Sequence, residues 1–157
     1  MASTYIEYRK KGFEANDGFM AVWLLLIIDE IDKLTNAPTW LTTLRDDWFL
    51  EATEGFGYGV DPALDHYIHT SGQRDTMLTL AERALMRLKG YGPSISCDEL
   101  NRIREHGKDF RFTSDLPIDE FVRTAEFFTR LLREELRPDE TDSRIFRPRP
   151  SPPPNRT

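Results

Sequence analysis

The sequence predicts an all-α fold, a single bundle of five to six helices around one central apolar helix. Residues 19–28, FMAVWLLLII, are apolar without a break, and a helix that is apolar on every side is surrounded by other elements. Several other segments repeat apolar residues at the three-to-four-residue spacing of amphipathic helices. The 157 residues suit one domain, so we expect a helical domain over residues 1–136 and a separate tail over residues 137–157.

The elements are expected in the following order. Residues 4–10, with β-favouring aromatics, predict a short strand or an extended arm, and residues 11–17 predict a loop that ends in helix-capping residues. Asn16 or Asp17 caps the first helix. A second short strand over residues 110–113 would give one two-stranded pairing with residues 4–10. Helices are expected over residues 17–34, 38–53, 62–70, 73–89, 96–106 and 117–136.

The tail differs from the rest of the chain in composition. Residues 137–157 hold six of the ten prolines and five arginines, which predicts an extended or disordered segment. Ile145 and Phe146 are its only large apolar residues, and we expect them to dock the segment on the domain or on a neighbouring chain. A homodimer through this tail, or through exposed aromatic side chains, is one open alternative. A tail that shields the acidic part of its own domain is another.

Charge and composition exclude several classes of protein. The net charge of −6 argues against non-specific nucleic-acid binding, which depends on Lys and Arg. The apolar run of residues 19–28 is too short to span a membrane, and the acidic residues Glu7, Glu14 and Asp17 before it do not suit a signal peptide. Cys97 is the single cysteine, so no internal disulfide is expected. These features predict a cytoplasmic protein that is not bound to membranes.

The glycine-rich stretch at residues 55–60, GFGYGV, invites comparison with phosphate-binding loops. Such loops read G-x-G-x-x-G, follow a strand and open a helix. Here the spacing differs, a helix is expected before the stretch, and residues 46–73 contain no Lys or Arg. We therefore interpret it as a bend in which Gly55 ends one helix and the pair Asp61-Pro62 begins the next.

Catalytic and metal-binding patterns are weak. His66 and His69 are three residues apart on an expected helix, with Asp61 and Asp65 close by, but an H-x-x-H pair alone does not define a metal site. Cys97 would sit at a helix start, where a thiol pKa falls, yet two acidic residues follow it. No nucleophile, base and orienting group can be assembled. We expect no cofactor and no resident metal, and a non-catalytic protein is favoured over an enzyme.

The acidic residues cluster in one part of the chain. Between Gly12 and Asp61 there are ten acidic and two basic residues, so this part carries more negative charge than the whole chain. Asp47, Glu51 and Glu54 form one stripe at helical spacing. A concentrated negative surface speeds encounter with a basic partner. The residues predicted to bind such a protein partner are Asp29, Asp32, Asp46, Asp47, Glu51 and Glu54.

Two functions follow as hypotheses. The first is a non-catalytic protein-binding protein that presents this acidic surface to a basic partner. In general character it is similar to the immunity proteins that neutralise basic toxins, although no motif carries that resemblance. The alternative is a small metal-dependent hydrolase that uses His, Asp and Glu residues on helices.

Overall fold

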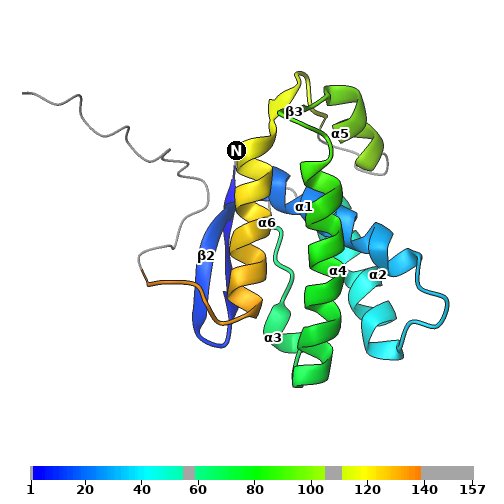
Figure 1. Cartoon of the computed structure of the whole chain (residues 1–157), viewed down its shortest axis with the longest axis vertical. Helices are drawn as coiled ribbons and strands as arrows, with labels where there is room; N and C mark the ends of the chain where they lie inside the picture. The colour runs from blue at the N-terminus through cyan, green and yellow to red at the C-terminus, as the bar shows by residue number, and fades with distance from the viewer. Residues whose placement is uncertain (1, 55–58, 105–110, 139–157) are drawn as a thin grey trace, which may run out of the picture.

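A computed structural model describes residues 2–54, 59–104 and 111–138 (Figure 1). The chain begins with an antiparallel hairpin and continues mainly as helix. Its elements are β1 (Ser3–Tyr8), β2 (Lys11–Asn16), α1 (Asp17–Asp32), α2 (Thr39–Glu54), α3 (Leu64–Tyr67), α4 (Ser71–Lys89), β3 (Ser94–Ile95), α5 (Cys97–Ile103), β4 (Leu116–Pro117) and α6 (Ile118–Leu132).

Helix α1 lies at the centre of the molecule, as the apolar run predicts. Thirteen of its sixteen residues are buried, and it contacts α2, α4, α5, α6 and β2. Helices α4 and α6 run side by side across one face (Figure 1). Trp23 and Trp48 both pack edge-on against Phe128, which joins α1, α2 and α6. The prediction of a mainly helical protein with a buried central helix is confirmed.

The N-terminal hairpin differs from the prediction. Residues 11–16 were expected as a loop but form β2, which pairs with β1 in a register that opposes Tyr8 and Lys11. Phe13 and Ala15 alternate toward the core and are fully buried, and this burial outweighs the loop character of Gly12 and Asn16. Residues 111–113 form no strand, and residue 110 lies outside the described residues. The second pairing joins β3 and β4 instead.

The caps explain where several helices begin. The Asn16 side chain accepts hydrogen bonds from the backbone N–H groups of Gly18 and Phe19, so Asn16 caps α1. Thr70 and Gln73 form a reciprocal capping box at α4. The Ser96 hydroxyl accepts from the Glu99 N–H group, as the sequence predicts for α5.

The third predicted helix is much shorter than expected. Only Leu64–Tyr67 is helical, not residues 62–70. The Asp61 carboxylate accepts from the Ala63 N–H at 2.8 Å, and Ala63 adopts a left-handed φ of 48°. Asp61 therefore closes a turn of its own in place of capping a helix. Helix α6 is also shorter than predicted, because the chain turns at Glu134, whose φ is 59°.

Three other predicted boundaries fall wholly or partly on residues that the structure does not describe. Gly55 and the end of the fifth predicted helix, residues 105–106, lie outside the described residues, as does the tail from residue 139. In the described part of the chain, every helix is too short or too polar to cross a lipid bilayer.

Candidate functional site

The candidate site is built on α2 and the turn that precedes α3. Leu41, Leu44, Trp48 and Ala52 form the buried face of α2. The Trp48 Nε1–H group donates to the Pro62 carbonyl at 2.8 Å, in a buried position. This bond fixes the turn at residues 61–63 against the flank of α2 that carries Asp47 and Glu51.

A surface hollow of about 290 Å³ lies between these elements. We call it the acidic hollow. Three carboxylates, those of Asp47, Glu51 and Asp61, lie in its lining, and within residues 2–54, 59–104 and 111–138 no Lys or Arg does. The remaining lining is largely apolar or aromatic, so that carboxylates stand beside apolar surface. The lining residues are Asp47, Trp48, Leu50, Glu51, Asp61, Pro62, Ala63 and Tyr67.

Each of the three carboxylates accepts a hydrogen bond from another residue of the hollow. The Tyr67 hydroxyl donates to Asp47 Oδ2, which holds that carboxylate in place. Burial, and then this bond to Asp47, raise the pKa of Tyr67 above its ordinary value. Tyr67 therefore stays protonated and acts as a donor over the whole physiological range.

The surroundings of Glu51 disfavour a negative charge on its carboxyl group. Burial raises the pKa of its carboxyl, and the charges of Asp61, Asp17 and Asp47 raise it further, while a bond from the Asp61 N–H group, at 3.3 Å, works in the opposite direction. A carboxylate in such surroundings gains from a cation placed beside it.

The six residues predicted to bind a partner fall into separate places. Asp47 and Glu51 line the acidic hollow, and Glu54 lies exposed at the end of α2. Asp29 and Asp32 lie on α1, on the other flank of α2. There Arg87 Nη1 is 2.7 Å from Asp29 Oδ2.

Arg45 pairs with Asp32 through two bonds of 3.0 Å and lies 3.5 Å from Asp46. A smaller hollow of about 210 Å³ contains Asp29 and Asp32, but Arg45 and Arg102 line it as well. Its acidic and basic groups balance. In the described part of the chain, Asp29, Asp32 and Asp46 therefore have basic partners, whereas the acids of the acidic hollow have no basic residue in its lining.

Asp61 and Tyr67, which supply polar groups to the acidic hollow, were absent from the predicted set. Asp61 was interpreted as a helix cap, and Tyr67 carried no signal because tyrosine occurs on many amphipathic helices. One clue was present in the sequence: residues 46–73 contain no Lys or Arg, so acids in this segment have no nearby cation along the chain.

The residues considered for metal or nucleophilic chemistry do not come together. His66 and His69 are both exposed, and within residues 2–54, 59–104 and 111–138 no three His, Cys, Asp or Glu side chains are placed to share a metal ion. The Cys97 N–H group donates to Asp115 at 2.8 Å. This bond to a carboxylate adds negative charge beside the thiol.

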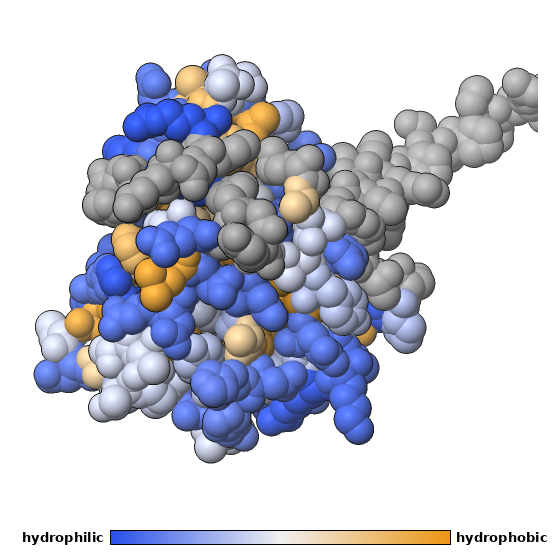
Figure 2. All heavy atoms as spheres, turned by 180° about the vertical axis from the view of Figure 1, so that it is seen from behind, coloured by the Kyte–Doolittle hydropathy of each residue, from blue (hydrophilic) through white to orange (hydrophobic). Residues whose placement is uncertain are grey.

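One face of the molecule can be judged for apolar patches from Figure 2. The face seen in Figure 2 is mostly hydrophilic, with apolar atoms in small separate spots.

Comparison with protein-family models, curated proteins and solved structures gave no match.

Proposed function

We propose that the chain is a non-catalytic protein-binding protein whose acidic hollow receives a basic side chain of a partner protein. The observation that carries the proposal is the set of three carboxylates, Asp47, Glu51 and Asp61, in one hollow whose described lining residues include no basic one. Asp29 and Asp32, by contrast, are already matched by Arg87 and Arg45.

The mixed lining suits the chemistry of a lysine or arginine side chain. These side chains lay an aliphatic stem on apolar surface while the charged end reaches polar groups. Leu50, Pro62 and Ala63 offer the apolar surface, and the carboxylates offer the acceptors. Because Tyr67 holds Asp47 in place, little side-chain freedom is lost when a partner binds there.

Two broader predictions belong with this proposal. The single cysteine supports a cytoplasmic location, where thiols stay reduced. The contacts of α2, α4 and α6 with α1 support the arrangement of the helices as one bundle, which gives α2 a rigid support for the hollow.

The proposal is tested by capture of partners from lysate on immobilised full-length chain, with washes at low and high salt. A basic protein should be retained at low salt and released at high salt, because exposed charges are screened. Asp47→Asn/Glu51→Gln should lose it. Asp29→Asn/Asp32→Asn changes the net charge equally and should keep it. Retention by the first variant, or loss by both, would contradict the proposal.

A further inference from the structure

A third hollow is lined by basic side chains. It has a volume of about 190 Å³ and is formed by the outer face of the β1–β2 hairpin, near its turn, and by the residues that follow α6. We call it the hairpin pocket. Among the residues that the structure describes, its lining contains three cationic side chains and no carboxylate, in a protein of net charge −6. The lining residues are Tyr5, Lys10, Lys11, Gly12, Leu136, Arg137 and Pro138.

The floor of the hairpin pocket is apolar. The Tyr5 ring lies over Gly12 so closely that a Cβ there would stand 2.7 Å from Tyr5 Cζ. Leu136 is buried beside it. A cavity of about 150 Å³ accepts a benzene-sized group, so the hairpin pocket has room for one aliphatic side chain inside a basic rim.

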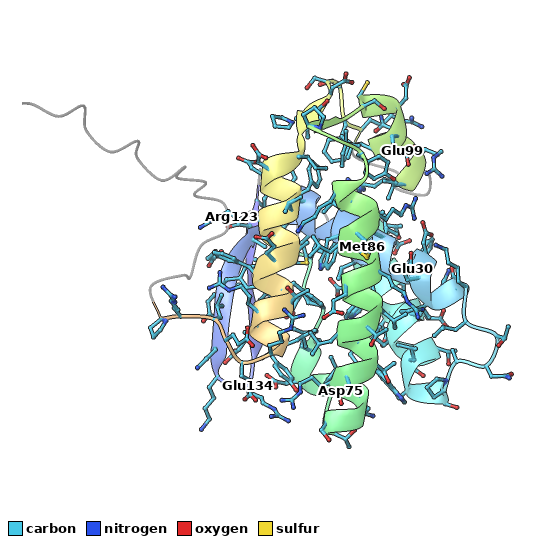
Figure 3. All side chains as sticks on the ribbon, viewed as in Figure 1. Glu30, Asp75, Met86, Glu99, Arg123 and Glu134 are labelled. Atoms are coloured by element: carbon cyan, nitrogen blue, oxygen red, sulfur yellow. The ribbon has the colours of Figure 1, made fainter. Side chains whose placement is uncertain are left out.

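The turn beside the pocket is energetically unfavourable for its residues. Arg9 and Lys10 have φ angles of 49° and 68°, which Asn-Gly adopts at much lower cost. Arg9 is held there by Glu134, itself left-handed, at 3.3 Å, and Arg74 reaches the same carboxylate oxygen at 3.1 Å. Figure 3 shows Glu134 just beyond the end of α6. The sequence thus keeps long basic side chains where turn geometry alone would favour others.

Helix α2 of the same chain carries a surface of complementary character, an exposed apolar residue among carboxylates. Leu50 is 54% exposed, and its helical neighbours are the carboxylates Asp46, Asp47, Glu51 and Glu54. In the described part of the chain the exposed large apolar residues are Tyr5, Leu50 and Met86. Two of these three therefore belong to the hairpin pocket and to the acidic surface of α2.

We propose that two copies of this chain associate through these surfaces, with Leu50 and its surrounding carboxylates from one copy seated in the hairpin pocket of the other. The inference rests on the proposed function, because it names a partner for the same acidic surface. Leu50 would cover the Tyr5 ring and Leu136, while Lys10 and Lys11 meet the carboxylates.

Charge decides between a second copy and a polyanion such as nucleic acid. A polyanion meets the repulsion of the whole acidic molecule, and the hairpin pocket offers only a few cations to offset it. A second copy brings apolar surface as well as carboxylates. At 0.15 M salt the screening length is about 8 Å, so neighbouring charges at the contact outweigh the repulsion between net charges. The contact is small, so a weak and concentration-dependent association is expected.

Sedimentation equilibrium of the full chain, from about 10 μM to about 1 mM protein at 0.15 M salt, tests the inference. Wild type should gain mass with concentration. Leu50→Lys, which breaks the acidic surface, and Lys10→Gln/Lys11→Gln, which breaks the pocket rim, should each stay monomeric. An equimolar mixture of the two variants should form a 1:1 dimer that grows no further, because one intact contact remains.

Matched controls lie on α4. Met86→Lys makes the same exchange as Leu50→Lys at an exposed residue (Figure 3) outside both surfaces. Arg83→Glu changes the net charge as much as Lys10→Gln/Lys11→Gln. Both controls should associate like wild type.

A wild type that stays monomeric throughout would overturn the inference, and so would a monomeric mixture of the two variants. Neither result touches the proposed function, because capture of a foreign basic partner is measured separately. Conversely, self-association with no captured partner would leave the inference standing and remove the wider proposal.

Discussion

At the scale of single residues, Thr4 is the junction between the hairpin, α1 and the segment that leads to the acidic hollow. Its hydroxyl donates to Asp17 Oδ1 at 2.6 Å and accepts from the Val60 N–H at 3.1 Å. Asp17 is 1% exposed. A buried carboxylate needs such donors, because burial of an unpaired charge is expensive.

Thr4→Val should therefore destabilise the fold by roughly 2 kcal/mol, since two polar groups lose their partner while the side-chain volume is kept. Urea unfolding followed by circular dichroism measures the change. Thr79→Val is the control, because Thr79 is exposed and its hydroxyl bonds only to the Asp75 carbonyl of its own helix. An equal cost for both variants would mean that Thr4 is not a special junction.

Glu51 illustrates a cost that a binding site imposes on stability. Burial, with the charges of Asp61, Asp17 and Asp47, raises the pKa of its carboxyl in the folded chain. The folded state then holds the proton more tightly than the unfolded state. Its stability contribution is full below the unfolded pKa and is lost as the pH rises through the raised folded value.

Glu51→Gln should accordingly stabilise the chain at pH 7, by up to about 0.5 kcal/mol after allowance for solvent screening. Near pH 3, where both forms are neutral, the difference from wild type should vanish. Thermal unfolding at the two pH values measures it. A variant that is less stable than wild type at pH 7 would show that the Glu51 charge is compensated.

At the scale of elements, the hairpin turn carries the clearest prediction. Lys10 has a φ of 68°, a conformation that costs roughly 1 kcal/mol for a side chain and almost nothing for glycine. Lys10→Gly should raise the free energy of unfolding by roughly that amount, while it weakens self-association. Lys11→Gly, on the paired strand, should not stabilise. Chemical unfolding measures the free energy of unfolding of both variants, and an equal gain for the two would contradict the prediction.

The elements also show how far the sequence could predict the fold. Apolar spacing was sufficient for α2, α4 and α6, because it reports directly on a buried face, and an unbroken apolar run was sufficient for the fully surrounded α1. The hairpin was half missed, because Gly12 and Asn16 suggested a loop and only tertiary burial of Phe13 reveals the strand. Helix α3 was predicted to be longer than it is, because the pair Asp61-Pro62 is equally compatible with a turn and with a helix start.

At the scale of the whole molecule, the candidate site also divides into residues that the sequence could identify and residues that only tertiary contacts bring together. The sequence correctly identified α2 as acidic, and Asp47 and Glu51 do line the hollow. It had no means to separate them from Asp29 and Asp32, whose partners Arg87 and Arg45 are supplied by contacts between helices distant along the chain. Asp61 and the hairpin pocket likewise depend on which loops meet in space.

Recognition of basic groups by the acidic hollow, and not by the total negative charge, is tested by an NMR titration of isotopically labelled chain with a nine-arginine peptide at 0.15 M salt. Recognition by the hollow predicts saturable shifts concentrated at Asp47, Leu50, Glu51 and Asp61, with about tenfold weaker binding in Asp47→Asn/Glu51→Gln and nearly unchanged binding in Asp29→Asn/Asp32→Asn. Shifts of similar size at Asp29 and Asp32, or equal weakening in both variants, would contradict it.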